Sequence, residues 1–155
     1  MKRTVLLAVL VAWPTLAQAQ NWSAHQKEII EQVRRCNDGW VASIKQKEFK
    51  TFDDVCPETS DAVFWYTSSD APAAYGGPKG VWAGSSSQNR SVTWDDMQPV
   101  TVQIDGDLAF IYYVVTWTVE PNTGVTRRSR SRRLTVFERR DGRWLMAGGT
   151  IAAVK

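Results

Sequence analysis

The sequence predicts an α+β domain in which helices pack on one face of an antiparallel sheet. Helical periodicity is confined to residues 23–56, and strand-like segments joined by turn residues occupy most of the chain after residue 61. Helices first and consecutive hairpins afterwards are typical of this class. With 155 residues, the chain is long enough for one domain and too short for two ordinary ones.

Residues 1–19 have the pattern of a secretory signal peptide. Lys2 and Arg3 form a basic start, residues 4–16 are mostly apolar, and residues 17–19 read Ala-Gln-Ala, an A-x-A cleavage site. The apolar run is too short to span a membrane as a helix. We therefore expect a domain over residues 20–155 that is periplasmic or secreted. The alternative is an N-terminal anchor that is not cleaved.

Ser23 and Gln26 form a capping-box signature, which predicts that the first helix begins at these residues. Apolar residues then recur at helical spacing, and they are Ile29, Val33, Cys36, Trp40 and Ile44. This stripe predicts a surface helix with one buried face. A shorter amphipathic segment follows, with Phe49, Phe52 and Cys56 on one side, and it ends at Pro57.

Cys36 and Cys56 are the only cysteines, and each lies on the apolar face of its predicted helix. In an oxidising compartment an even pair is most simply a disulfide. Two buried free thiols are the main alternative. A redox-active pair is less favoured because the chain has no C-x-x-C motif.

The strands begin after residue 61, where the period changes. Residues 62–66 read as a short strand, and residues 68–89, rich in Gly, Ser, Pro and Ala, read as a long loop with one helical turn at 80–83. Four longer strands are expected at about residues 94–104, 108–119, 125–138 and 143–154. The turns between them fall at residues 106–107, 121–124 and 141–142.

The last hairpin turns at Asp141-Gly142, the strongest short-range hairpin signal in the chain. A two-residue turn there pairs Arg139 with Trp144, Phe137 with Met146, Thr135 with Gly148 and Arg133 with Thr150. Because side chains alternate along strands, all of these share one face. We therefore expect Arg133, Thr135, Phe137, Trp144 and Thr150 to form one wall of a pocket.

The strand at residues 108–119 is apolar on both faces. Phe110, Tyr112 and Val114 point one way, and the intervening residues, also apolar or aromatic, point the other way. Helices can cover only one of these faces. We expect a second copy of the chain to cover the other, which predicts a homodimer formed sheet to sheet.

Several segments resemble the SnoaL-like branch of the nuclear transport factor 2-like superfamily. They are the two opening helices, residues 106–109, which start a strand, and residues 137–144, which form the last turn. The hairpin and residues 26–30 are also similar to the association domain of calcium/calmodulin-dependent kinase. The resemblance implies a cone-shaped roll, in which a strongly bent antiparallel sheet wraps around the N-terminal helix and leaves a cavity. Dimers through the outer sheet face are common in the superfamily.

The resemblance also implies where site residues should lie. Catalytic relatives use an Asp or His in the cavity as general base. The association domain carries histidine near the end of its last strand and arginines on the two strands before it. Thr150, Thr116 and Thr135 occupy those places here, with Gly148 at the place of a further histidine. Arg133 is the one cation that could replace the missing arginines.

The sequence has few residues suited to binding a metal ion or to nucleophilic catalysis. The only histidine, His25, falls in the first turn of the first helix, and the paired acids are adjacent or in turns. No G-x-S-x-G motif is present. We therefore expect no metal site and no cofactor. Because the signal peptide takes two basic residues with it, the net charge of +3 is weak evidence for a nucleic-acid partner.

Eight arginines lie between Arg127 and Arg143, beside only Glu138 and Asp141. These arginines either balance acidic groups elsewhere on the surface or form a strip that attracts anions. The sequence does not distinguish the two.

Aromatic residues are plentiful, with eight tryptophans in the chain. They either fill the core or line an apolar cavity that binds a planar or acyl ligand, with Arg133 pairing its carboxylate. The candidate ligand-binding residues are Trp40, Trp65, Tyr112, Thr116, Arg133, Thr135, Trp144 and Thr150.

Two functions are therefore open. The favoured one is a non-catalytic ligand-binding or dimerisation module that binds neither nucleic acid nor membrane. The alternative is a small-molecule isomerase, dehydratase or hydrolase that uses Asp38, Glu58 or Asp61 as its acid.

Overall fold

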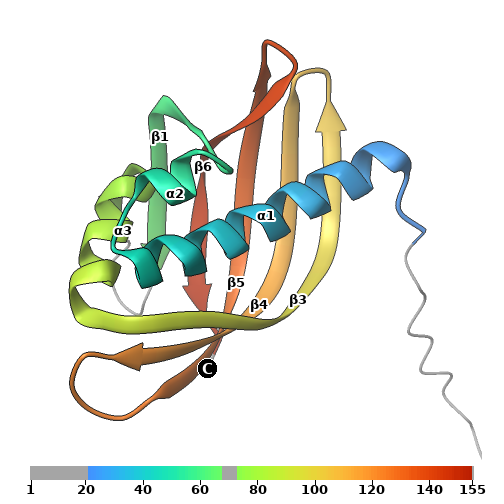
Figure 1. The fold of residues 1–155 in the computed structure, drawn as a ribbon. Helices are drawn as coiled ribbons and strands as arrows, with labels where there is room; N and C mark the ends of the chain where they lie inside the picture. The colour runs from blue at the N-terminus through green and yellow to red at the C-terminus, as the bar shows by residue number, and fades with distance from the viewer. Residues whose placement is uncertain (1–20, 68–72, 155) are drawn as a thin grey trace, which may run out of the picture.

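The computed structural model describes residues 21–67 and 73–154, and its fold is an α+β roll. The elements in order are α1 (Ala24–Gln46), α2 (Lys50–Asp53), β1 (Glu58–Thr67), β2 (Ala73–Gly76), α3 (Gly77–Gln88), β3 (Asn89–Asp105), β4 (Leu108–Pro121), β5 (Arg127–Arg140) and β6 (Arg143–Ala153). Helix α1 lies across the concave face of a bent sheet (Figure 1). The predicted fold class is therefore confirmed. The predicted signal peptide lies outside the described residues.

The six strands form one sheet in the order β2-β1-β6-β5-β4-β3. Four of the five neighbouring pairs are antiparallel, as expected, but β1 and β6 are parallel. The expectation of a wholly antiparallel sheet is wrong at this pair. Parallel neighbours need a long connection, and here α3 and four strands separate β1 from β6 along the chain.

Helix α1 begins at the predicted cap. The Ser23 hydroxyl accepts a hydrogen bond from the backbone N–H of Gln26, and the Gln26 side chain accepts one from the backbone N–H of Ser23. The apolar stripe is buried on the sheet side, with Ile29, Val33, Cys36 and Ile44 almost fully covered. The helix ends at Lys47, which adopts the left-handed conformation with φ 59°. Sequence and structure agree throughout this element.

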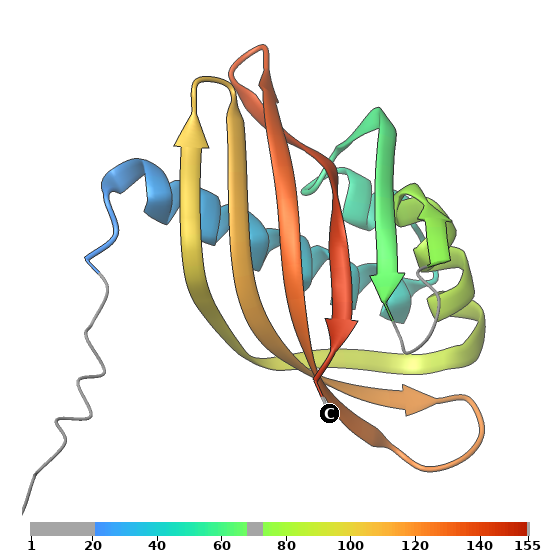
Figure 2. The same cartoon turned by 180° about the vertical axis from the view of Figure 1, so that it is seen from behind.

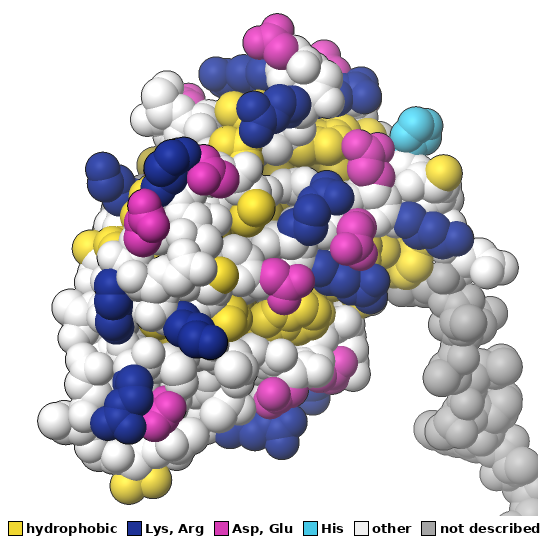
Figure 3. Space-filling model, in the orientation of Figure 1, with side chains coloured by type: hydrophobic (Ala, Val, Ile, Leu, Met, Phe, Trp, Pro, Cys, Tyr) yellow, Lys and Arg dark blue, Asp and Glu magenta, His cyan; other side chains and the backbone are white. Residues whose placement is uncertain are grey.

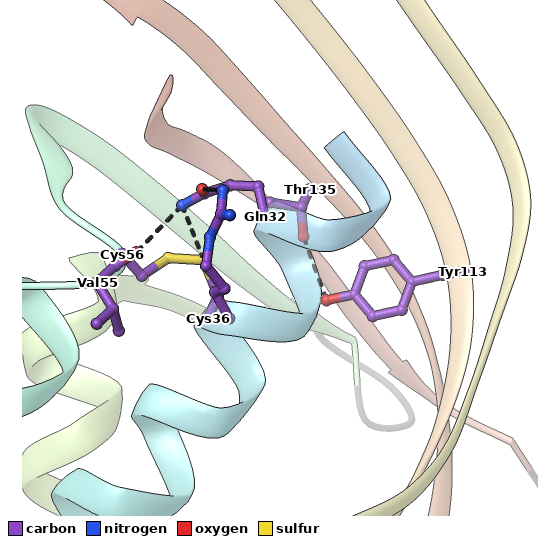
Figure 4. The surroundings of a disulfide bond; sticks show 7 residues. Gln32, Cys36, Val55, Cys56, Tyr113 and Thr135 are labelled. Atoms are coloured by element: carbon purple, nitrogen blue, oxygen red, sulfur yellow. Dashed lines mark hydrogen bonds between the residues drawn. A yellow bond between two sulfur atoms is a disulfide. The ribbon is translucent and has the colours of Figure 1, made fainter. Parts of the chain in front are cut away.

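The disulfide between Cys36 and Cys56 is present, with the two Cα atoms 5.0 Å apart. It joins α1 to the segment after α2 (Figure 4). Gln32, one turn before Cys36, supports the same junction, because its side-chain amide donates a hydrogen bond of 3.2 Å to the Val55 carbonyl. The predicted pairing is confirmed, and it fixes α2 against the helix that covers the sheet.

The segment at residues 68–89 is not the predicted long loop. Residues 68–72 lie outside the described part, but β2 and the twelve-residue helix α3 occupy most of the rest. The sequence of α3 does not predict a helix, because it contains several glycines and serines, and both are poor helix formers. Interactions outside the helix hold its end instead: Lys47 donates to the carbonyls of Ser86 and Asn89, and Asn89 donates to the Ser85 carbonyl.

The register of the last hairpin changes along its length. Near the turn, Phe137 faces Met146 and Arg139 faces Trp144, as predicted. An irregularity between Val136 and Phe137 then shifts the pairing by one residue, so that Arg133 faces Ile151 rather than Thr150. A bulge of this kind reverses which face the following side chains occupy. The predicted wall is therefore interrupted at its far end.

The convex face of the sheet is covered by no helix in the described residues, as the view from behind shows (Figure 2). Large apolar side chains are exposed on it, including Phe110 on β4 and Val63 and Trp65 on β1. The alternate residues of β4, from Ala109 to Trp117, are buried on the concave side. The two-sided character predicted for this strand is confirmed.

Charged groups are mixed over the surface. Basic and acidic side chains alternate over the face that carries α1 (Figure 3). On the arginine-rich strand, Arg128 pairs with Asp95 at 3.3 Å, Arg139 with Asp107 at 3.0 Å and Arg140 with Glu138 at 2.7 Å. These pairs favour the interpretation that the arginines balance neighbouring acids. None of the helices in the described residues is long and apolar enough to cross a membrane.

Candidate ligand-binding cavity

A cavity of about 230 Å³ lies between α1 and the concave face of the sheet. This volume is many times the space that one water needs. Helix α1 supplies one side through Val33, Cys36, Asn37 and Trp40, and α3 closes the end through Val81 and Ser85. The cavity thus lies within the roll, where the bend of the sheet leaves space beside the helix.

Strand β5 supplies the polar side of the cavity. Ser129, Ser131, Arg133 and Thr135 alternate along the strand, so all four face inward and line the cavity. The other elements contribute mostly aliphatic and aromatic groups, among them Phe52, Phe64 and Met146. Outside this row of hydroxyl and guanidinium groups the lining is mostly apolar, with Asn37, Ser85 and Tyr113 as its other polar residues.

Arg133 is held in place from two sides. Its Nε donates a hydrogen bond of 3.3 Å to the Ser131 hydroxyl, and its Cζ lies 4.9 Å from the centre of the Trp117 ring. Neither terminal nitrogen of the guanidinium has a hydrogen-bond partner among the described residues. These two nitrogens form the fork that binds carboxylates in a bidentate manner. Arg133 therefore offers an oriented site for an anionic group inside a largely apolar cavity.

Tyr113 and Thr135 mark the most buried part of the polar row. Each side chain is only 3% exposed, and the tyrosine and threonine hydroxyls lie 3.4 Å apart (Figure 4). The pair links β4 to β5 from the inside of the sheet. The two hydroxyls therefore face each other at this end of the cavity.

Aromatic side chains line the side opposite β5. Trp40 on α1 meets Phe52 edge to face, with ring centres 5.4 Å apart, and both line the cavity. The Cys36 side of the disulfide lies beside them. This arrangement offers apolar contact to an aryl or acyl group.

Three of the predicted ligand-binding residues line the cavity, namely Trp40, Arg133 and Thr135. Three others, Trp65, Tyr112 and Thr116, lie on the convex face. On their strands the inward positions belong to the neighbours Phe64, Tyr113 and Trp117. The structure therefore does not bring Trp65, Tyr112 and Thr116 into the cavity. Strand β4 is apolar on both faces, so alternation alone could not tell which face is concave.

The two remaining predicted residues also lie away from the cavity lining. Trp144 is buried beneath Arg139, and its Nε1 donates a hydrogen bond of 3.1 Å to Glu28 on α1. Together with Phe137, it belongs to the core near the turn. Thr150 faces Leu134 across the ladder and lies on the convex face, because the bulge in β6 reverses its side. Ile151 lines the cavity in its place.

The sequence interpretation missed eight polar or aromatic residues of the cavity, which are Asn37, Phe52, Phe64, Ser85, Tyr113, Trp117, Ser129 and Ser131. For Ser131 the signal was available, because it shares the strand face of Arg133 and Thr135. For Asn37 it was also available, because the residue lies four positions after Val33 and three before Trp40. Asn37 is a polar residue within the otherwise apolar stripe of α1.

The acids considered for catalysis lie elsewhere. Asp38 is exposed and accepts a hydrogen bond of 2.8 Å from Trp94. Glu58 and Asp61 lie in the first half of β1 and do not line the cavity. Among residues whose side chains the structure describes, the cavity lining contains no carboxylate and no histidine. His25 is exposed and lies 4.0 Å from Glu28.

Metal-ligating groups are not gathered in the described part of the chain. No three side chains of His, Cys, Asp or Glu come close enough there to hold a metal ion. The polar groups that converge in the cavity are thus suited to hydrogen bonding and to anion binding.

An α+β roll with a cavity between the first helix and a bent sheet defines the nuclear transport factor 2-like class of proteins. The family model described as the calcium/calmodulin dependent protein kinase II association domain matches residues 26–148. This chain therefore belongs to that association-domain family. No curated protein matches it by sequence.

Several solved structures have the same fold. A nuclear transport factor 2-like protein from Salmonella enterica superposes with a TM-score of 0.65 at 14% identity, over 84% of this chain and 91% of the other. A candidate association domain from Xanthomonas campestris gives 0.57 at 20% identity, over 79% and 86%. A candidate dehydratase from Streptomyces avermitilis gives 0.60 at 15% identity, over 83% and 98%. At these identities the likeness establishes the fold alone, and that fold hosts several functions.

Proposed function

We propose that this chain is an exported, non-catalytic module that binds a small carboxylate ligand with an apolar body. The observation that carries the proposal is how the Arg133 guanidinium is oriented and hydrogen-bonded. Its guanidinium is oriented by Ser131 and Trp117, and neither terminal nitrogen has a hydrogen-bond partner in the described part of the chain. A cation with no acidic partner in an apolar cavity gains most from an anionic ligand.

The rest of the cavity supports an aryl or acyl body for this ligand. Trp40, Phe52 and Trp117 present ring faces and edges to the void. Contact with such rings favours planar or aliphatic groups. The ligand would therefore place its carboxylate against β5 and its apolar part against α1 and α2.

The enzymatic alternative has weaker support. Structures of this fold include candidate dehydratases, so the fold itself is compatible with catalysis. General acid–base chemistry needs a titratable group within hydrogen-bond reach of the substrate. Asp38, Glu58 and Asp61 are all outside the lining of the cavity. Binding without reaction is therefore the function we favour.

Location and assembly are part of the same proposal. The signal-peptide pattern at residues 1–19 and the Cys36–Cys56 disulfide favour a periplasmic or secreted domain over residues 20–155. The exposed apolar side chains on the convex face favour a homodimer formed sheet to sheet.

The proposal can be tested by titrating the purified protein with 4-phenylbutyrate while recording tryptophan fluorescence. We expect saturable binding, because Trp40 and Trp117 line the cavity. Arg133→Gln should weaken this binding by about 10- to 100-fold, since a charge-assisted hydrogen bond contributes about 1.5–3 kcal/mol.

Arg132→Gln is the matched control. It removes the same charge from the neighbouring residue, whose side chain is exposed on the opposite face of β5, and it should leave the affinity nearly unchanged. Absence of saturable binding would contradict the proposal, and so would an equal loss of affinity in the two variants.

A further inference from the structure

We infer that Asn37 is a second recognition point in the cavity, and that the ligand is an N-acylated amino acid or a molecule of the same pattern. That pattern is a carboxylate, a secondary amide a few bonds away and an apolar acyl or aryl group. The inference rests on the proposed function, because it assigns the carboxylate to Arg133.

Asn37 is an unusual residue for its position. It lies within α1, is only 4% exposed and lines the cavity. The one hydrogen-bond partner of its side chain among the described residues is the Met97 sulfur, 3.8 Å from Nδ2. A thioether is a weak acceptor, and the Asn37 carbonyl oxygen has no partner in the same part of the chain.

Such an arrangement is costly for the free protein. The Met97 thioether replaces only part of the hydrogen bonding that water gives an amide, and asparagine is a poor helix former. The neighbouring cavity residues of α1, Val33 and Trp40, are apolar. An apolar side chain would satisfy packing at this position equally well. A hydrogen bond from the amide to a ligand would explain why an asparagine occupies this position.

The position of Asn37 relative to Arg133 limits the ligand. The Asn37 side chain contacts Met97 on β3. The Arg133 guanidinium stacks on Trp117 on β4. Met97 pairs with Val115, so Met97 and Trp117 are diagonal neighbours on adjacent strands. Diagonal neighbours lie about 7–8 Å apart. We therefore take the ligand group that meets Asn37 to be a few bonds from the carboxylate.

A secondary amide is the group that best matches Asn37. The asparagine side chain carries one acceptor oxygen and two donor hydrogens, so it can accept from an amide N–H and donate to an amide carbonyl. Trp40 lies one helical turn further along the same face, with Phe52 against it. The acyl or aryl group attached to the amide would contact these two rings.

Hippurate and 4-phenylbutyrate form a matched pair of probes for this inference. Both join a phenyl ring to a carboxylate through three chain atoms, and only hippurate has an amide in that chain. Dissociation constants for both probes would be measured by isothermal titration calorimetry with wild-type protein and with Asn37→Leu. Leucine is close to asparagine in shape and has no polar group.

We expect the preference for hippurate over 4-phenylbutyrate to fall about tenfold in Asn37→Leu, because a site that hydrogen-bonds a polar group discriminates against its absence. Asn37→Ala should reduce the preference in the same direction. Arg133→Gln should instead weaken the binding of both probes by similar factors and leave the ratio of their dissociation constants unchanged. In the absence of ligand, Asn37→Leu should unfold at a temperature equal to or above that of the wild type.

The outcomes separate this inference from the proposed function. If neither probe binds, or if binding does not depend on Arg133, both are overturned. If both probes bind through Arg133 and their ratio is the same in wild type and Asn37→Leu, the inference is overturned and the proposed function stands. If both Asn37 variants fail to fold, Asn37 is a structural residue and the inference is likewise overturned.

Discussion

Glu58, the first residue of β1, is a carboxylate that the fold tolerates at a cost. Its Oε2 is buried and has no hydrogen-bond partner among the described residues. Burial raises the pKa of Glu58 above its ordinary value, the nearby Asp53 carboxylate raises it further, and Lys79 opposes the shift. The folded state therefore binds this proton more tightly than the unfolded chain does.

From this shift we expect Glu58→Gln to raise the free energy of unfolding at neutral pH. A raised folded-state pKa destabilises the fold fully above that pKa, and the effect disappears as the pH falls below the ordinary glutamate range. Urea unfolding of both proteins at about pH 7 and about pH 3.5 would measure this, since the unperturbed pKa is about 4.3. Glu48→Gln, which removes an exposed carboxylate, is the control. A gain for Glu58→Gln that does not change with pH would contradict the explanation.

Single cavity residues were predictable where one strand or helix fixed their direction. Arg133 and Thr135 share a strand face, and Trp40 shares the helical stripe, so sequence spacing alone brought these three together. Trp65 and Tyr112 lie on the convex face instead. Their strands carry apolar residues at every position nearby, and only the direction in which the whole sheet bends decides which face is concave.

At the level of elements, the boundaries of the long helix and strands followed from capping and turn residues, whereas the bulge in β6 did not. The glycines in Ala147-Gly148-Gly149 are compatible with a bulge, but they do not show that one forms. The reason for the bulge is long-range: β6 pairs with β1 on its other side, and Gly148 lies directly against the Val63 backbone. This contact involves residues far apart in the sequence, so periodicity could not reveal it.

Gly148→Ala tests the bulge. The glycine has a φ of 149°, and a Cβ there would lie 2.7 Å from the Val63 carbonyl oxygen. We expect the substitution to lower the free energy of unfolding by about 1–3 kcal/mol, the usual cost of such a strained backbone, as measured by urea denaturation. Gly80→Ala in α3 is the control, because its Cβ would meet nothing within 4 Å. It should stabilise the helix by up to about 1 kcal/mol. Equal stability of the Gly148 variant and the wild type would contradict the expected clash.

The whole molecule has two unequal faces. The concave face is closed by α1, while the convex face exposes Phe110 and Trp65 around the half-buried Tyr112 and Leu134. Tyr112 and Leu134 pair directly, on neighbouring strands of the sheet. Apolar side chains gathered on an otherwise bare sheet usually mark an interface. The same strand thus supplies the cavity on one side and the proposed dimer contact on the other.

Tyr112→Glu should therefore separate the proposed dimer without emptying the cavity. A charge at the centre of an apolar interface is desolvated without a partner, which is strongly unfavourable. Sedimentation equilibrium at micromolar concentration should give the mass of two chains for the wild type and of one chain for the variant.

Val125→Glu is the control, since Val125 is apolar and 82% exposed but lies in the loop between β4 and β5. This variant should remain dimeric. A wild-type mass of one chain would rule out the dimer. Unchanged 4-phenylbutyrate affinity in Tyr112→Glu would show that the cavity functions within a single chain.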